Sequence, residues 1–377
     1  MSKNNENKLV PTLRFPEFKE VWNLEQLSNL LDYERPDRYI VKDTNYIKEG
    51  TPVLTANKSF ILGYTQETDG ICVNIPTIIF DDFTVDKKYV DFSFKVKSSA
   101  IKILRPKGKN DLKFIFELMS LIRFEAKEHK RYYISAYQNL SVPIPKPNEQ
   151  QKIATCLSSL DEVITAESKK LEILKDHKKG LLQNILPQEG ETVPKFRFKE
   201  FEGSGEWEEK ELGSFCLSLS SGKDKNVVVG EYELYGSTGI IGRAENASYE
   251  GDFILVARVG ANAGLLNKVK GKFGVTDNTL VIDLVKKDLI SFIFYSLEGV
   301  GLNKLVFGSG QPLITGGQLK SFLLSIPNSE QEQEKIADTL SSIDELINAQ
   351  SQKVEAIKLH KKGLLQGLFP DVNTVNE

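Results

Sequence analysis

Residues 148–186 read NEQQKIATCLSSLDEVITAESKKLEILKDHKKGLLQNIL, and residues 333–369 read QEKIADTLSSIDELINAQSQKVEAIKLHKKGLLQGLF. The two stretches are copies of one another. The letters KKGLLQ recur at 178–183 and 361–366, and from His177 to His360 the separation along the chain is 183 residues. The chain is therefore organised around a long segment that it contains twice.

Apolar residues in each copy recur in alternating steps of three and four. They are Ile153, Leu157, Leu160, Ile164, Leu171, Leu174, Leu181 and Ile185, then Ile336, Leu340, Ile343, Ile347, Val354, Ile357, Leu364 and Leu368. A narrow stripe at a 3.5-residue repeat is the seam of a coiled coil, because it keeps one helix face turned toward a partner. We predict that the copies pair with each other as antiparallel helices, with Leu157 to Leu181 and Leu340 to Leu364 forming the helix-pair interface.

The stripe is interrupted, and its ends are marked. Polar residues occupy two seam positions in each copy: Glu167 and Lys178, then Gln350 and Lys361. Such breaks commonly set register. Asn148 with Gln151, and Ser329 with Glu332, have the spacing of a capping box, and Pro187 and Pro370 end the helices. At about 1.5 Å per residue, each helix is expected to be roughly 55–60 Å long.

The repeat extends beyond the helices. VPTLRFPEF from Val10 is echoed by VPKFRFKEF from Val193, and Trp22 and Trp207 follow them. A period of this length indicates duplicated domains, since solenoid units are about 20–50 residues long. We predict a disordered lead (1–9), domain 1 (10–146), a long helix (147–187), a linker (188–192), domain 2 (193–327), a second long helix (328–370) and a tail (371–377).

Each globular domain contains short strand-like runs and one helix. The runs are IPTIIF (75–80), FSFKV (92–96) and AIKIL (100–104) in domain 1, then FILVARV (253–259) and TLVIDLV (279–285) in domain 2. A helix pattern follows from Asp111 and from Asp288. The predicted fold class is α+β: two similar strand-rich domains separated by two long antiparallel coiled-coil helices, with internal pseudo-two-fold symmetry.

Composition sets bounds on this interpretation. The chain has 377 residues, 40% hydrophobic and 27% charged, with a net charge of −3. No run is long and apolar enough to cross a bilayer, and the lead MSKNNENK lacks the apolar core of a signal peptide. The scattered Cys72, Cys156 and Cys216 are typical of a reducing compartment. We expect a cytoplasmic protein without a membrane or metal site.

With this layout the chain resembles a known family, the specificity subunits of type I restriction–modification systems. The resemblance covers about Val10 to Pro370. It is carried by YGSTGIIG from Tyr235, GDFILVARVGANAG from Gly251, KFGVTDNTL from Lys272, GSGQPLIT from Gly308 and the LSSIDE of the second long helix. Domain 1 has its own variant, PVLTANKSFILGY from Pro52, and lacks the first and fourth of these motifs.

The resemblance implies a non-catalytic function. Such subunits bind double-stranded DNA at a two-part site, one half per target-recognition domain, while the helices set the spacer. They dock two modification subunits that methylate adenine N6 with S-adenosylmethionine, and restriction subunits that use ATP and magnesium join them. This chain would bind no cofactor itself.

Enzymatic alternatives rest on weaker patterns. The glycine-rich loops 236–242 and 260–264 lack the order of a nucleotide-binding loop, and the chain has no Asn- or Asp-Pro-Pro-Tyr methyltransferase signature. Asp81, Asp82 and Asp86-Lys87-Lys88 superficially suggest a magnesium-dependent nuclease. We expect a solvated loop there instead. A scaffold that binds only protein is the third class, to be distinguished by whether selective DNA affinity exists.

DNA contact needs cations for phosphates and polar or planar groups for base edges. Loops that carry the motifs are where such residues usually lie. The predicted DNA-binding residues are Thr55, Asn57, Lys58, Tyr64, Lys95 and Lys97 in domain 1, and Tyr235, Ser237, Thr238, Arg243, Arg258, Asn262 and Gln311 in domain 2.

Overall fold

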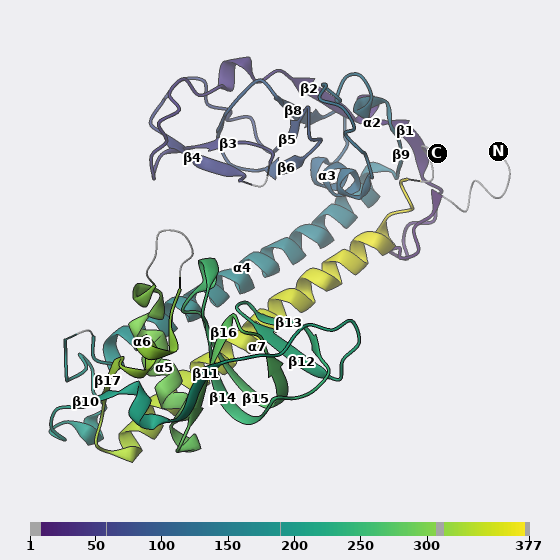
Figure 1. Cartoon of the computed structure of the whole chain (residues 1–377). Helices are drawn as coiled ribbons and strands as arrows, with labels where there is room; N and C mark the ends of the chain where they lie inside the picture. The colour runs from purple at the N-terminus through teal and green to yellow at the C-terminus, as the bar shows by residue number, and fades with distance from the viewer. Residues whose placement is uncertain (1–8, 58, 189, 307–312, 374–377) are drawn as a thin grey trace. The chain divides into compact units, whose positions relative to one another are not determined.

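The computed structural model describes residues 9–57, 59–188, 190–306 and 313–373 (Figure 1). Its contacts divide the chain into two compact units. Unit 1 comprises residues 1–166 and 353–377, and unit 2 comprises residues 167–352. Each unit therefore contains one strand-rich domain together with a portion of each long helix.

Unit 1 is built from short strands around one domain helix. Its elements are β1 (Asn23–Gln26), α2 (Leu27–Leu30), β2 (Leu31–Glu34), β3 (Thr51–Leu54), β4 (Ile61–Thr65), β5 (Thr77–Asp81), β6 (Lys87–Val90), β7 (Lys95–Val96), β8 (Ile101–Pro106), α3 (Leu112–Leu121) and β9 (Ser141–Ile144). The long helix α4 (Pro147–Ile185) begins here. The strands form sheets of order β2-β8-β5-β6 and β4-β3-β7, and β1 pairs with β9. Asp111 caps α3 by accepting a hydrogen bond from the Phe114 amide.

Unit 2 has a similar but not identical order of elements, and the last of them, a long helix, continues into unit 1. They are β10 (Glu208–Glu211), β11 (Cys216–Ser221), β12 (Tyr232–Gly236), β13 (Gly239–Ala244), β14 (Tyr249–Ala257), β15 (Leu266–Val275), β16 (Thr279–Leu284), α5 (Ile290–Val300), α6 (Gly316–Lys320), β17 (Leu323–Ile326) and α7 (Glu330–Leu368). One sheet has the order β11-β16-β14-β15-β12-β13, and β10 pairs with β17. The strand runs predicted at 75–80, 253–259 and 279–285 are confirmed as β5, β14 and β16, with small differences at their ends.

The two repeated tryptophans anchor equivalent cores. Trp22 is 1% exposed, and its ring lies 5.7 Å from that of Phe114 on α3. Trp207 is 2% exposed and lies 6.1 Å from Phe292 on α5. In each unit the end of a long helix packs into this core, through Phe369 in unit 1 and through Leu182, Ile185 and Leu186 in unit 2. Burial of these side chains therefore joins the helices to the domains.

Each long helix begins at a buried Arg–Glu pair. Arg14 donates two hydrogen bonds to Glu149, both 2.8 Å, and Arg197 donates two to Glu332, both 2.7 Å. Both glutamates lie in the first helical turn, where a carboxylate also interacts favourably with the helix dipole. The separation of 183 residues recurs from Arg14 to Arg197. This bidentate pair was not foreseen from the sequence.

The predicted capping boxes are only partly correct. Ser329 does cap α7, accepting a hydrogen bond from the Glu332 amide at 3.3 Å, but the Glu332 side chain is held by Arg197. The first helix starts at Pro147, so Asn148 lies inside it and is not its cap. Proline is favoured at the first helical position because the amide that it lacks has no partner there.

The polar residues of the seam bond to other elements within each unit. In unit 2, Lys178 of α4 bonds to Asp344 of α7 and to Glu298 of α5, each at 2.8 Å. In unit 1, Lys361 of α7 bonds to Asp161 of α4 at 2.6 Å and to Glu117 of α3 at 3.1 Å. These two networks are repeat equivalents. Each seam lysine thus ties the two long helices and the domain helix together.

The same contacts show the direction of pairing. In unit 2, residue 178 faces residue 344, whereas Glu167 accepts hydrogen bonds from Gln350. From residue 167 to residue 178 the number rises along α4, while that of the partner residue on α7 falls from 350 to 344, so the helices are antiparallel. The predicted fold class, two strand-rich α+β domains with two long antiparallel helices, is confirmed. The predicted domain boundaries stay a prediction, because each compact unit includes portions of both helices.

The predicted interface residues lie on the covered side of the helices. Leu157, Leu340 and Val354 are buried, and the remaining nine are half-buried: Leu160, Ile164, Leu171, Leu174, Leu181, Ile343, Ile347, Ile357 and Leu364. Leu157 and Leu340 belong to the domain cores. Four apolar helix residues outside the predicted stripe are exposed: Val163, Ile173, Leu346 and Leu359. Contributions of the single interface residues stay predictions.

Removing one arginine of a helix-start pair should destabilise the protein strongly. Arg197→Ala leaves the Glu332 side chain, which is 1% exposed, without its cation. We expect the free energy of unfolding to fall by about 3–5 kcal/mol, because an uncompensated buried charge is costly. Urea unfolding followed by tryptophan fluorescence measures it. Arg38→Ala, which removes an exposed pair with Glu34, is the matched control and should change little. Equal effects of both substitutions would contradict this role.

The seam network should make stability depend on pH. Burial opposes ionisation of Asp161, but hydrogen bonds from Lys113 and Lys361 outweigh it and hold the Asp161 pKa below its ordinary value. A lowered pKa stabilises the fold above the unfolded-state value of about 3.9, and this contribution is lost as pH falls through the folded value.

Lys361→Met should therefore cost about 1–3 kcal/mol near neutral pH, because the carboxylates lose a charged hydrogen-bond partner. The difference from the unsubstituted chain should shrink as pH is lowered toward about 3. Urea unfolding at several pH values measures it. Lys358→Met, which removes only an exposed pair with Glu355, should show no such trend. A difference independent of pH would argue against the ionic role of Lys361.

Candidate nucleic-acid interface

The two domains share one backbone frame although their sequences differ. The parallel pairing of β3 with β7 (Leu54↔Val96) matches that of β12 with β15 (Tyr235↔Val275). Three backbone hydrogen bonds, each from an amide to a carbonyl, also have counterparts in the other unit. In unit 1 they are Lys97→Leu54, Asp82→Ala100 and Tyr132→Asp82. Their counterparts in unit 2, in the same order, are Thr276→Tyr235, Arg258→Asn278 and Ile314→Arg258. These bonds define which residues of the two domains are equivalent.

The frame brings three connections together at one end of each domain. They are the connection from β3 to β4 (or from β12 to β13), the residue that follows β5 or β14 (Asp82 or Arg258), and the turn before β8 or β16 (97–100 or 276–278). In unit 2, for example, the Asn278 carbonyl accepts hydrogen bonds from the Arg258 amide and from Ser237 Oγ, at 2.9 and 3.2 Å. Residues far apart in sequence thus form one candidate interface per unit.

Three of the six predicted residues of domain 1 lie at this end: Thr55, Asn57 and Lys97. Thr55 and Asn57 are in the hairpin turn, where the Asn57 amide oxygen accepts a 3.4 Å hydrogen bond from Thr84. Lys97 is exposed in the turn before β8. Tyr64 lies on β4, half-buried and paired through its backbone with Ile47. Lys58 lies outside the described residues.

Lys95 cannot act as the predicted phosphate contact in this conformation. Its side chain is 1% exposed, and its ammonium bonds to Glu67 at 2.8 Å and to the Asp69 carbonyl at 2.7 Å. Both residues of β7, Lys95 and Val96, are buried, whereas Lys97 is exposed in the turn that follows the strand. We therefore remove Lys95 from the candidate DNA-binding residues.

The predicted residues of domain 2 divide between two places. Tyr235, Ser237 and Thr238 belong to the converging end, with Thr238 exposed, whereas Asn262 is exposed in the short turn 260–262 that follows Arg258 along the chain. Burial raises the pKa of the half-buried Tyr235 phenol, which donates to Glu233, so this group stays neutral. Arg243 is exposed on β13, several residues away from the hairpin turn.

One further predicted residue belongs to the same end of unit 2. Arg258 lies at its centre, where its amide and carbonyl both take part in the shared frame. Gln311 lies outside the described residues. The converging end of unit 2 thus contains a guanidinium, hydroxyls and amides, which are groups that can bond to base edges.

The structure also reveals a cluster in unit 1 that sequence patterns did not indicate. The His129 ring stacks on Phe83 at 4.7 Å between centroids, and the guanidinium of Arg131 lies 5.7 Å from the same ring. Phe83 follows β5, whereas His129 and Arg131 come from the loop after α3. A stacked aromatic pair with a cation is suited to nucleic-acid contact. Only tertiary structure brings residues this far apart in sequence together.

The nuclease-like carboxylates of domain 1 have structural roles. Asp81 accepts hydrogen bonds from the amides of Phe83 and Thr84, and Asp82 forms a buried ion pair with Lys102 at 3.0 Å. Burial lowers the pKa of Lys87 to about 8, and its ammonium lies 5.7 Å from the ring of Tyr137. Across the described ranges, no three candidate ligands are grouped so that they could hold a metal ion.

Many of the remaining basic residues are paired on the surface. Arg105 contacts Glu34, Lys107 contacts Asp32 and Lys130 contacts Glu128 in unit 1. Lys270 and Lys272 lie near Asp252 and Glu250 in unit 2. Exposed pairs of this kind contribute little to stability and exchange readily for phosphate contacts.

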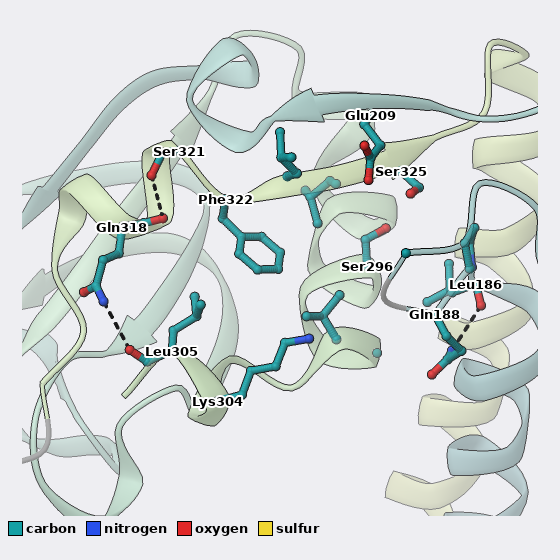
Figure 2. A pocket seen from close by; sticks show the side chains of 16 residues that line it. Leu186, Gln188, Glu209, Ser296, Lys304, Leu305, Gln318, Ser321, Phe322 and Ser325 are labelled. Carbon is teal, nitrogen blue, oxygen red and sulfur yellow. Dashed lines mark hydrogen bonds between the residues drawn. The ribbon is translucent and has the colours of Figure 1, made fainter. Parts of the chain in front are cut away.

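A cavity of about 430 Å³ lies in unit 2 where α4 ends (Figure 2). Gln188 and Gln318 bond across its walls to the backbone carbonyls of Leu186 and Leu305, both at 3.2 Å. Unit 1 has a cavity of about 480 Å³ at the equivalent place, beside Phe369 and Pro370 at the end of α7. Because a cavity lies at the end of a long helix in both units, we interpret these cavities as features of the fold and not as ligand sites.

Comparisons with known proteins agree with this architecture. The Escherichia coli type I restriction enzyme EcoR124I/EcoR124II specificity subunit is 41% identical over 145 residues, 37% of this chain and 36% of that protein. This match spans about a third of the relative's length. The MjaVIII specificity subunit of Methanocaldococcus jannaschii is 25% identical across 90% of this chain and 87% of its own.

A solved structure has the same fold over nearly the whole length. The crystal structure of the type I restriction-modification system S subunit from M. genitalium superposes with a TM-score of 0.67 at 16% identity, covering 96% of this chain and 99% of that one. In the described residues no helix has an apolar run that could span a membrane.

The family profile accounts for the internal repeat directly. The profile described as type I restriction modification DNA specificity domain matches residues 19–176 and again residues 204–359. Both matches include a strand-rich domain and most of the long helix that follows it. The chain therefore belongs to the family of type I restriction–modification DNA specificity subunits.

Proposed function

We propose that this chain is the subunit that selects the DNA sequence in a type I restriction–modification complex. Each domain binds one half of a two-part target in double-stranded DNA, and the long helices set the length of the spacer between the halves. The chain has no catalytic role and binds no cofactor. It acts in the cytoplasm, where the DNA is.

The observation that carries this proposal is the constant frame with variable contents. The two domains share their pairing and turn hydrogen bonds, yet the side chains at the converging ends differ: Thr55, Asn57, Asp82 and Lys97 in unit 1, and Ser237, Thr238, Arg258 and Thr276 in unit 2. Two domains with the same backbone bonds and different side chains at this end are suited to bind two different half-sites. An enzyme would need one set of reacting groups, and Asp81 and Asp82 are already engaged within the fold.

The partners follow from the family. Two modification subunits, which transfer methyl from S-adenosylmethionine to adenine N6, dock on the long helices, and restriction subunits that use ATP and magnesium complete the complex. The helices present apolar residues for this docking. Val163 and Leu359 of unit 1 are 44% and 70% exposed, and Ile173 and Leu346 of unit 2 are 58% and 53% exposed. We propose that these four exposed side chains contact the modification subunits.

The proposal is tested by sequencing DNA for N6-methyladenine in cells that express this chain with its modification partner. We expect a two-part motif with methyladenine in each half that is absent when the chain is omitted. Omission of the chain is the control. Methylation unchanged by its omission, or a continuous motif, would contradict the proposed function.

Docking on the helices is tested by one substitution and a matched control. Leu359→Glu places a charge on the proposed docking face, and we expect binding of the modification subunit to weaken at least about tenfold, since a buried unpaired carboxylate disfavours the interface. Leu217→Glu alters an equally exposed leucine on β11, also 70% exposed, and should leave binding unchanged. Titration calorimetry measures both. Equal affinities for the two variants would place docking elsewhere.

A further inference from the structure

Asp82 in unit 1 and Arg258 in unit 2 occupy equivalent positions, and the shared backbone bonds hold this position on both sides. In both domains its amide donates to the turn before β8 or β16. Its carbonyl accepts from a residue that follows the domain helix, Tyr132 in unit 1 and Ile314 in unit 2. The backbone is therefore held on both sides, and only the side chain differs. A residue held this way places its terminal group with little freedom, which is what recognition of a base edge requires.

In unit 2 this position carries a guanidinium without a partner. Among the described residues, no hydrogen bond or ion pair involves the Arg258 guanidinium, and its Nε is buried. The part-buried Arg14 and Arg197 each bond to a glutamate. Arg258 itself is half-buried, but a buried N–H donor such as its Nε costs free energy when it has no acceptor. Such a group persists most readily where a ligand supplies the acceptors.

The surroundings of Arg258 suit a planar ligand with hydrogen-bonding edges. The hydroxyls of Thr276 and Thr279, in and beside the adjoining turn, are buried and also lack partners among the described residues. Ser237 lies at the same carbonyl of Asn278 that fixes the Arg258 amide. The arginine thus lies among short polar groups at the converging end, while basic residues suited to phosphates, such as Lys270, are exposed on the surface.

Unit 1 delivers a guanidinium to the equivalent place by another route. Asp82 is 1% exposed and paired with Lys102, so it cannot reach DNA itself. The Asp82 carboxylate also accepts a hydrogen bond from the Tyr133 amide at 2.8 Å, and it lies 3.9 Å from Arg131, which is 53% exposed. Arg131 directly precedes Tyr132, whose amide donates a hydrogen bond to the Asp82 carbonyl. Asp82 therefore acts as a positioning residue for Arg131.

We propose that Arg258 in unit 2 and Arg131 in unit 1 each read a guanine in their half of the target. An arginine bonds to guanine through O6 and N7 in the major groove, with two parallel donors that lysine lacks. This inference rests on the proposed function and adds to it a base and a residue for each half-site. Other arginines are not assigned this role, because Arg14, Arg105 and Arg197 are paired with glutamates within the fold.

The test combines substitutions in the protein with substitutions in the DNA. The full chain with its modification partner is titrated with the two-part target found by sequencing, in which single guanines are replaced by 7-deazaguanine. Loss of N7 at one guanine of a half-site should weaken binding of the unsubstituted chain roughly 5- to 150-fold. In Arg258→Ala, which has no donor for N7 or O6, the same replacement should cause no further loss. Arg131→Ala should remove the sensitivity at a guanine of the other half only.

The controls separate base reading from phosphate binding and from misfolding. Arg243→Gln, on exposed β13, should weaken all sequences alike and lower the salt dependence. Arg258→Gln is the second variant if Arg258→Ala does not fold, and it should shift the preferred base from guanine toward adenine, which glutamine reads.

Two failures are distinguishable. If the unsubstituted complex shows no sequence preference, the proposed function fails and this inference with it. If it shows preference, but every guanine replacement keeps its effect in both arginine variants, the guanine assignment is wrong while the function stands. A uniform loss over all sequences in the Arg258 variants would likewise overturn the assignment, because it is the mark of a phosphate contact.

Discussion

Each unit depends on one lysine ammonium in the seam between the long helices. Lys178 in unit 2 and Lys361 in unit 1 bond to an aspartate of the other long helix and to a glutamate of the domain helix. An apolar seam residue would pack in several registers, whereas a half-buried charge is stable only where its carboxylates meet it. The helix pair and the attachment of the domain are therefore set by the same group.

The Arg–Glu pairs at the helix starts complete this attachment. Arg14 and Arg197 come from the segment that enters each domain, and Glu149 and Glu332 from the first turn of the helix that leaves it. Entry and exit of the chain are thus joined by a bidentate bond that lysine could not reproduce. Both pairs recur with the repeat, so the same electrostatic contacts hold two domains whose other residues have diverged.

Because shared contacts hold each domain in place, the side chains that contact the ligand can differ between the domains. The bonds that define the converging ends are between backbone groups, so side chains there can be replaced without loss of the frame. Asp82 and Arg258 illustrate it: one position holds a carboxylate in one domain and a guanidinium in the other, with the same bonds on both sides. A net charge of −3 is compatible with DNA binding because the cations need only be local.

Periodicity in the sequence determined the long helices, their duplication and their pairing, because a 3.5-residue stripe leaves a helix one way to cover its apolar face. Short β-branched runs likewise predicted β5, β14 and β16. Much of the candidate interface also followed from motif-bearing loops, as Asn57, Ser237 and Arg258 show. Other features only the tertiary structure decided. The burial of Lys95 depends on the Glu67 carboxylate and the Asp69 backbone carbonyl, which accept its hydrogen bonds. The stack of His129 on Phe83 and the approach of Arg131 to Asp82 join segments far apart along the chain. No local pattern encodes such contacts, since they arise only when backbone bonds bring the segments to one place.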